Sequence, residues 1–194
     1  MNLPNKLTIS RIGLTFLFMI FLFCNGAVMK LLALIVFLIA SATDYYDGKI
    51  ARQRNEITDF GKFMDPIADK FLTLGAFVAF VEMGIVPAWM VVLIISRELI
   101  ITGVRLFAAT RGMVLSSEAA GKHKTVSQVV AIFAILVFIF LRSAGMKVFE
   151  VWSPSLEYWY RQVIFILMIC TVTLTLISGL SYLWRNRGLF LNAR

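Results

Sequence analysis

The chain has 194 residues, 60% of them hydrophobic and only 15% charged, with a formal net charge of +8. Soluble domains are about 45–50% apolar and about 25% charged, and a chain of this length cannot bury so much apolar surface in one core. These values exclude a disordered chain and a soluble globular enzyme, and they indicate a polytopic membrane protein. The positive charge is better explained by cytoplasmic loops at anionic headgroups, or by anionic substrates, so no nucleic-acid partner is expected.

Uncharged stretches predict six membrane-spanning helices in one all-α membrane domain over residues 1–194. The first and last stretches, residues 12–29 and 162–184, approach the length of about 20 residues that a simple span needs. The shorter stretches between them must be completed by charged turns, which should face the bundle interior or the interface. A turn is expected at Cys24-Asn25-Gly26. The predicted helices cover residues 7–24, 30–52, 63–82, 87–110, 122–142 and 160–185.

Lysines and arginines are unevenly divided between the two ends of these helices. Four lie on one side: Lys30, Arg142, Lys147 and Arg161. Thirteen lie on the side that holds both termini: Lys6, Arg11, Lys49, Arg52, Arg54, Lys62, Arg105, Arg111, Lys122, Lys124, Arg185, Arg187 and Arg194. The positive-inside rule therefore predicts a multi-pass protein of the cell membrane with both termini in the cytoplasm.

All five aspartates of the chain fall between residues 44 and 69. Asp44 and Asp47 are three residues apart near the end of one predicted helix, and Asp65 and Asp69 are four apart at the start of the next. Such spacings place two side chains one turn apart on neighbouring faces of a helix. Because a short loop joins the two helices, the four carboxylates are expected to converge at the cytoplasmic end of the bundle.

Four converging carboxylates cannot all stay ionised unless cations neutralise them. Oxygen ligands without histidine or cysteine favour Mg²⁺, Mn²⁺ or Ca²⁺, and paired divalent ions commonly serve phosphoryl chemistry. The alternative is a solvated acidic loop paired with nearby lysines and arginines, but one-turn pairs at the ends of apolar helices favour the metal site. Small residues beside the aspartates either let helices pack closely or leave room for a nucleobase and a diphosphate, and an arginine there can contact phosphate. These are Gly48, Ala51, Gly61 and Arg52.

The same segments match a known signature at every specified position. Residues 44–52 (DYYDGKIAR) and 61–69 (GKFMDPIAD), separated by eight residues, resemble the pattern D-x2-D-G-x2-A-R-x8-G-x3-D-x3-D of the CDP-alcohol phosphatidyltransferase family. The resemblance implies that an alcohol attacks the β-phosphate of a CDP-linked lipid and that CMP leaves. It also suggests a homodimer embedded in membrane lipids.

The resemblance further implies a role for individual residues. Two ions of Mg²⁺ or Mn²⁺ would be held by Asp44, Asp47, Asp65 and Asp69. Asp69 would also take the proton of the acceptor hydroxyl. The CDP-lipid would be bound by Gly48, Ala51, Arg52 and Gly61, together with Asn5 and Thr8 of the entry segment. Helix capping is the alternative role for Asn5 and Thr8.

A second group of cations surrounds the loop between the predicted helices 87–110 and 122–142. Arg97-Glu98, Ala108-Ala109 and residues 121–125 (GKHKT) resemble the phosphatidylglycerophosphate synthase branch of the family. That branch implies CDP-diacylglycerol as donor and sn-glycerol 3-phosphate as acceptor. The acceptor phosphate would be held by Arg105, Arg111, Lys122 and Lys124. Positive-inside topology alone also explains some of these charges.

Arg97 and Glu98 lie deeper in an apolar helix, where they are expected to pair. His123 is expected at the interface, without a catalytic role. The enzymatic alternatives are transferases with serine, inositol phosphate or a second lipid as acceptor. A divalent cation transporter is the alternative from another class, but it predicts carboxylates near the middle of the membrane.

Overall fold

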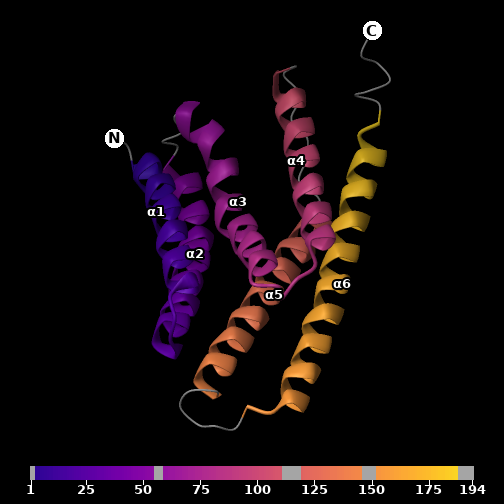
Figure 1. Ribbon diagram of the computed structural model, residues 1–194. Coiled ribbons are helices and arrows are strands. Elements are labelled where there is room, and N and C mark those ends of the chain that lie inside the picture. The colour runs from indigo at the N-terminus through magenta and orange to yellow at the C-terminus, as the bar shows by residue number, and fades with distance from the viewer. Residues whose placement is uncertain (1–2, 55–58, 111–118, 146–151, 188–194) are drawn as a thin grey trace. The chain divides into compact units, whose positions relative to one another are not determined.

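The computed structural model describes residues 3–54, 59–110, 119–145 and 152–187, and within these ranges all regular secondary structure is helical. Side chains are described for residues 10–43, 70–110, 124–145 and 152–187. The helices are α1 (Leu3–Phe23), α2 (Ala27–Arg54), α3 (Asp59–Glu82), α4 (Ala88–Thr110), α5 (Ala119–Ala144) and α6 (Pro154–Arg185) (Figure 1). The expected all-α fold of six helices is therefore confirmed for the described part of the chain.

The largest difference from the predicted bounds is at α6, which begins at Pro154 instead of residue 160. Ser153 caps this helix, because its Oγ accepts a hydrogen bond from the Leu156 amide at 3.2 Å. Proline at the first helical position has no amide hydrogen to leave unpaired. The pair Ser153-Pro154 is thus a local start signal, and it lies before the uncharged stretch of residues 162–184.

Two glycines with a positive φ lie at helix boundaries, Gly26 directly before α2 and Gly84 just after α3. Gly26 has φ 117° in the turn between α1 and α2, which confirms the turn expected there. Gly84 has φ 66° just after α3, and its amide donates to the Val81 carbonyl at 2.9 Å. L-residues with a side chain rarely adopt this left-handed conformation, so glycine suits both positions.

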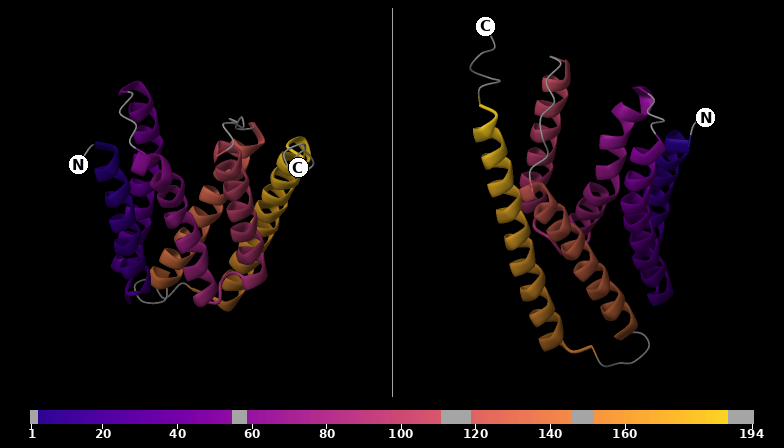
Figure 2. Two further views of the ribbon diagram at one scale, coloured as in Figure 1. Left: turned by 90° about the horizontal axis from the view of Figure 1, so that it is seen from above. Right: turned by 180° about the vertical axis from the view of Figure 1, so that it is seen from behind.

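The chain folds as two compact units, residues 1–79 with 132–160 and residues 80–131 with 161–194. In the first unit α1 and α2 pack along each other as an antiparallel hairpin, which Figure 2 shows from two further directions. Phe18 and Phe37 are fully buried between them, with ring centroids 5.9 Å apart. On α3, Phe71 lies 6.3 Å from the ring of Phe16.

The first unit also holds an aromatic cluster where α5 ends and α6 begins. The rings of Phe138, Trp152 and Tyr160 lie 5.7–5.8 Å from one another. Arg142 forms an ion pair with Glu157 at 3.4 Å, and the Trp152 indole donates to the same carboxylate at 3.2 Å. These contacts tie the beginning of α6 to the end of α5.

The helices expose much apolar surface. Two helical segments of the described chain, Lys124–Ala144 and Pro154–Arg185, are long and apolar enough to cross a membrane. Ser10–Phe23 and Ala27–Thr43 are apolar but shorter. On α6, Val163, Ile166, Ile177, Leu180 and Trp184 are all exposed. This apolar exterior gives the chain its membrane character.

Candidate functional site

The four aspartates lie on consecutive helices of the first unit. Asp44 and Asp47 are in the last turns of α2, and Asp65 and Asp69 are in the first turns of α3; their side chains lie outside the described ones. Only residues 55–58 separate these helices, which limits the gap between the helix ends to about 18 Å. The hairpin therefore brings both aspartate-bearing ends to the same end of the unit (Figure 1).

The residues that this end offers suit a hard divalent cation. Two pairs of carboxylates, each spaced by one helical turn, supply oxygen ligands alone, as Mg²⁺ and Mn²⁺ prefer. Among the side chains that the structure describes, no group of three or more potential ligands from histidine, cysteine, aspartate and glutamate occurs. The residue types at the aspartate-bearing ends of α2 and α3 are those expected at a divalent-metal site.

The residues expected at the CDP-lipid lie on the same helix ends. Gly48, Ala51 and Arg52 follow the first aspartate pair on α2, and Gly61 precedes the second pair on α3. All four side-chain positions are outside the described set. The first turns of α1 reach the same end of the unit, because α1 and α2 are antiparallel (Figure 1).

Asn5 and Thr8 are placed inside α1, which begins at Leu3. A capping residue precedes the first helical residue, so neither position is that of an N-cap. Their side chains lie outside the described residues. The helix bounds thus weaken the capping alternative and leave the expectation of nucleotide binding in place.

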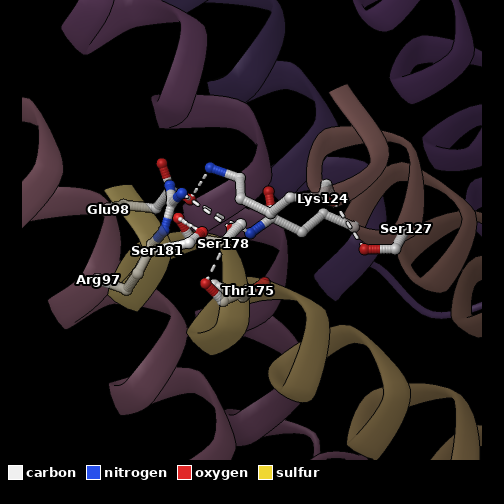
Figure 3. A network of polar contacts seen from close by, with 8 residues as sticks. Arg97, Glu98, Lys124, Ser127, Thr175, Ser178 and Ser181 are labelled. Atoms are coloured by element: carbon white, nitrogen blue, oxygen red, sulfur yellow. Dashed lines mark hydrogen bonds and ion pairs between the residues drawn. The ribbon is translucent and has the colours of Figure 1, made fainter. Parts of the chain in front are cut away.

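In the second unit, Glu98 of α4 forms the centre of a buried polar network (Figure 3). Its side chain is only 4% exposed, and its Oε1 accepts hydrogen bonds from the Lys124 ammonium, from Arg97 Nη1 at 3.4 Å and from Gln128 Nε2 at 3.5 Å. The expected pairing of Arg97 with Glu98 is confirmed. Because Lys124 and Gln128 come from α5, the network joins α4 to α5.

Arg97 extends this network to α6. Its Nη2 donates to Ser178 Oγ at 3.0 Å, and Ser178 donates in turn to the Thr175 carbonyl at 3.0 Å (Figure 3). The neighbouring Gly179 makes this approach possible, since a Cβ there would lie 2.8 Å from Arg97 Cγ. One network of charged and polar side chains thus connects α4, α5 and α6 within the second unit.

Arg105 lies seven residues after Glu98, and therefore two turns further along nearly the same face of α4. Its Nε donates to the Tyr182 hydroxyl at 3.3 Å, and its guanidinium lies 5.2 Å from the centre of the Tyr182 ring. Tyr182 is only 2% exposed, whereas Arg105 is exposed. A buried side chain of α6 thus orients a cation that remains open to a ligand.

The four cations expected at the acceptor phosphate differ in their surroundings. Arg105 is exposed, and Lys124 is buried and paired with Glu98. Lys122 lies in the first turn of α5, two residues before Lys124, and its side chain is outside the described ones. Arg111 and His123 also fall outside the described side chains. The structure therefore leaves Arg105 as the described member of the group that can meet an anion directly.

Sequence reasoning missed the partners of these cations. These partners lie in the long apolar helix α6 and are Tyr182, Ser178 and Gly179. The polar and small residues of this helix form no sequence pattern that indicates which of them meet a cation. A glycine within a membrane helix is a signal for close helix approach, and this signal was available at Gly179. Nothing in the sequence indicated that Tyr182 meets Arg105.

Comparisons with known proteins agree with the signature. The family described as CDP-alcohol phosphatidyltransferase matches residues 1–177. The chain is 43% identical over 148 residues to the CDP-diacylglycerol–glycerol-3-phosphate 3-phosphatidyltransferase of Bacillus subtilis, covering 70% of this chain and 77% of that protein. It is 33% identical over 193 residues to the protein of the same name from Salmonella paratyphi A, covering 96% of both. A probable phosphatidylglycerophosphate synthase of Mycobacterium tuberculosis is 35% identical over 187 residues, covering 95% of this chain and 81% of that protein.

Proposed function

Since the chain belongs to the CDP-alcohol phosphatidyltransferase family, we propose that it transfers a phosphatidyl group from CDP-diacylglycerol to sn-glycerol 3-phosphate, which gives phosphatidylglycerophosphate and CMP. The observation that carries the proposal is the complete signature on the adjoining ends of α2 and α3, together with relatives named for this reaction. The product is a precursor for phospholipid biosynthesis.

We assign the donor to the aspartate-bearing ends of α2 and α3. We assign the divalent ions, two of Mg²⁺ or Mn²⁺, to Asp44, Asp47, Asp65 and Asp69. When bound, such ions neutralise the diphosphate and the charge that develops on the leaving CMP. Gly48, Ala51 and Gly61 leave space for the nucleotide, Arg52 contacts phosphate, and Asn5 and Thr8 reach the nucleotide from α1.

Asp69 is assigned the proton transfer. Its carboxylate accepts the proton of the acceptor hydroxyl as that oxygen bonds to the β-phosphate and the bond to CMP breaks. A carboxylate beside metal ions is a weak base, but it needs only to take the proton while the hydroxyl becomes acidic in the transition state.

The acceptor phosphate is assigned to the cations near the end of α4 and the start of α5. Arg105 and Lys122 provide the main contacts, and Arg111 adds positive charge nearby. The exposed guanidinium of Arg105, oriented by Tyr182, supports this assignment, because an arginine held in one orientation can bind a phosphate through two hydrogen bonds. Lys124 contributes through the network with Glu98 and not as an unpaired cation.

We further propose that the chain crosses the membrane six times with both termini in the cytoplasm, and that it acts as a homodimer. The uneven distribution of lysine and arginine supports this orientation. A site at the cytoplasmic interface lets the acyl chains of the donor remain in lipid while the cytidine and the acceptor meet in water. The dimer rests on family resemblance alone.

CMP release from CDP-diacylglycerol tests the proposed reaction. The purified protein should release CMP with Mg²⁺ and sn-glycerol 3-phosphate, and much less with serine, inositol phosphate or a lipid alcohol as acceptor. Faster CMP release with one of those acceptors would indicate that the chain belongs to another branch of the family. No CMP release with any acceptor, together with Mg²⁺ uptake into proteoliposomes, would favour a cation transporter instead.

A further inference from the structure

Arg11 is a buried cation on α1 that has no part in the proposed chemistry so far. Its residue exposure is only 9%, which is rare for an arginine. The Thr15 hydroxyl donates to the Arg11 carbonyl at 2.9 Å, so this turn of α1 is also buried. A charge held in a largely apolar unit needs a compensating charge or hydrogen bonds nearby.

Contacts between α1 and α2 place Arg11 at the depth of the first aspartate pair. Phe18 packs against Phe37 with ring centroids 5.9 Å apart. Arg11 lies seven residues before Phe18, and Asp44 lies seven residues after Phe37. Because the helices are antiparallel, both steps run about 10 Å toward the same end of the unit (Figure 1).

Contacts between α1 and α3 place Arg11 level with the second pair. Phe16 and Phe71 have ring centroids 6.3 Å apart, and α1 and α3 begin at the same end of the unit (Figure 1). Arg11 lies five residues before Phe16, and the same step from Phe71 ends between Asp65 and Asp69. Side chains in a helix lean toward its N-terminus, so Arg11 extends from its Cα toward the end where the aspartates lie.

We propose that Arg11 is a positioning residue, a fixed counter-cation at the depth of the four aspartates that holds them together before metal binds. The inference rests on the assignment of those aspartates to the proposed metal site. Four carboxylates brought to one end of a helix hairpin repel each other, and a buried guanidinium lowers this repulsion. Divalent ions add positive charge to the same place. Once they bind, they neutralise part of the carboxylate charge that Arg11 alone compensates in their absence.

A double-mutant cycle in EDTA tests the coupling without metal and without substrate. The variants are Arg11→Met, Asp44→Asn and the two combined, and the measurement is the thermal unfolding midpoint in detergent. Arg11→Met alone should lower the midpoint by about 5 °C or more, because it leaves the carboxylates without their counter-charge. In the Asp44→Asn background, Arg11→Met should lower the unfolding midpoint by about half as much or less.

Lys30→Met provides the matched control. Lys30 is a partly buried cation of α2 whose ammonium donates to the Leu22 carbonyl at the other end of the hairpin. It lies 14 residues before Asp44, which is about 21 Å along the helix. Its effect on the unfolding midpoint should add to that of Asp44→Asn. Equal losses for Arg11→Met with and without Asp44→Asn would show that Arg11 only packs, and the proposal would be wrong.

Arg11→Lys keeps the test decisive if Arg11→Met does not fold. The Arg11→Lys variant should fold with an unfolding midpoint close to that of the wild type. Adding Asp44→Asn to Arg11→Met should restore folding. Failure of both the lysine variant and the rescue would assign Arg11 to packing alone.

Repeating the cycle with Mg²⁺ separates this proposal from the proposed function. Saturating Mg²⁺ should raise the wild-type midpoint and reduce the loss caused by Arg11→Met. Coupling in EDTA without any effect of Mg²⁺ on the wild type would support Arg11 and contradict the metal site. If Mg²⁺ stabilised the wild type but the effects of Arg11→Met and Asp44→Asn were additive in EDTA, the metal site would be supported and the role of Arg11 contradicted.

Discussion

Arg105 and Lys124 belong to one group of cations in the sequence, but burial gives them different roles. Lys124 is 7% exposed and paired with Glu98, whereas Arg105 is exposed and supported by Tyr182. A buried ion pair mainly holds helices together, because its charges are already matched. An exposed arginine with a fixed orientation can instead bind a phosphate.

Arg105→Ala should therefore raise the KM for glycerol 3-phosphate by about ten- to a hundredfold. A charge-assisted contact to phosphate contributes about 1.5–3 kcal/mol, and each decade corresponds to about 1.4 kcal/mol. Steady-state CMP release at varied acceptor concentration measures this. The KM for CDP-diacylglycerol should change much less. If both constants rose together, Arg105 would be a charge of the positive-inside pattern and not an acceptor ligand.

Loss of a single metal-binding carboxylate is a second prediction at the residue scale. Asp44→Asn, Asp47→Asn and Asp65→Asn should each abolish turnover, because each removes an anionic ligand from a site built of carboxylates alone. CMP release at limiting Mg²⁺ is the measurement. Asp59→Asn is the matched control, since Asp59 lies at the start of α3 outside the signature. A variant with near-normal activity at limiting Mg²⁺ would remove that residue from the metal site.

Asp69 is expected to differ from the other three aspartates. Asp69→Asn should reduce the rate more than it weakens CMP binding, because a general base typically contributes about 10²–10⁴-fold to the rate. Single-turnover rates and CMP affinity, measured on the same preparation at saturating Mg²⁺, separate the two effects. A rate above about one hundredth of the wild-type rate would contradict the role as base.

At the scale of helices, the second unit depends on how closely α4 approaches α6. Arg97 passes over Gly179, and a Cβ at that position would lie 2.8 Å from Arg97 Cγ. Gly103 on α4 is the opposite case, since nothing lies within 4 Å of the position that its Cβ would take. The two glycines therefore differ in the space that a side chain would have.

Gly179→Ala should lower the thermal unfolding midpoint, and Gly103→Ala should leave it unchanged or raise it. Alanine is favoured over glycine within a helix by about 1 kcal/mol, so only the clash with Arg97 can reverse the sign at Gly179. Thermal unfolding of both variants in the same detergent is the measurement. Stabilisation by Gly179→Ala would contradict the close approach of Arg97 to α6.

At the scale of the whole molecule, the orientation in the membrane is open to direct measurement. In a background without Cys24 and Cys170, single cysteines in residues 53–62 and 111–121 should react with an impermeant reagent only from the cytoplasmic side. A cysteine at Lys147 should react only from outside. Labelling of residues 53–62 or 111–121 from outside would overturn the six-span proposal. Such labelling would also separate the aspartates from the cytosolic acceptor.

The sequence by itself determined the helical class, the six helices and the family. Long apolar stretches interrupted by charged turns leave a chain few alternatives to helices, and the aspartate signature is a local pattern that needs no tertiary information. The local start signal of α6 at Ser153-Pro154 was present in the sequence but lay outside the apolar stretch used to predict the helix.

Only the tertiary structure decided which charges meet. Glu98 binds Lys124 from α5, Arg97 reaches Ser178 on α6, and Arg105 meets Tyr182 across 77 positions of sequence. The depth of Arg11 likewise depends on how Phe18 and Phe16 pack against α2 and α3. Charge patterns along a helix indicate which side of a membrane a residue faces. Packing sets the rotation and register of each helix, and these decide whether a cation pairs with a carboxylate or remains open to a substrate.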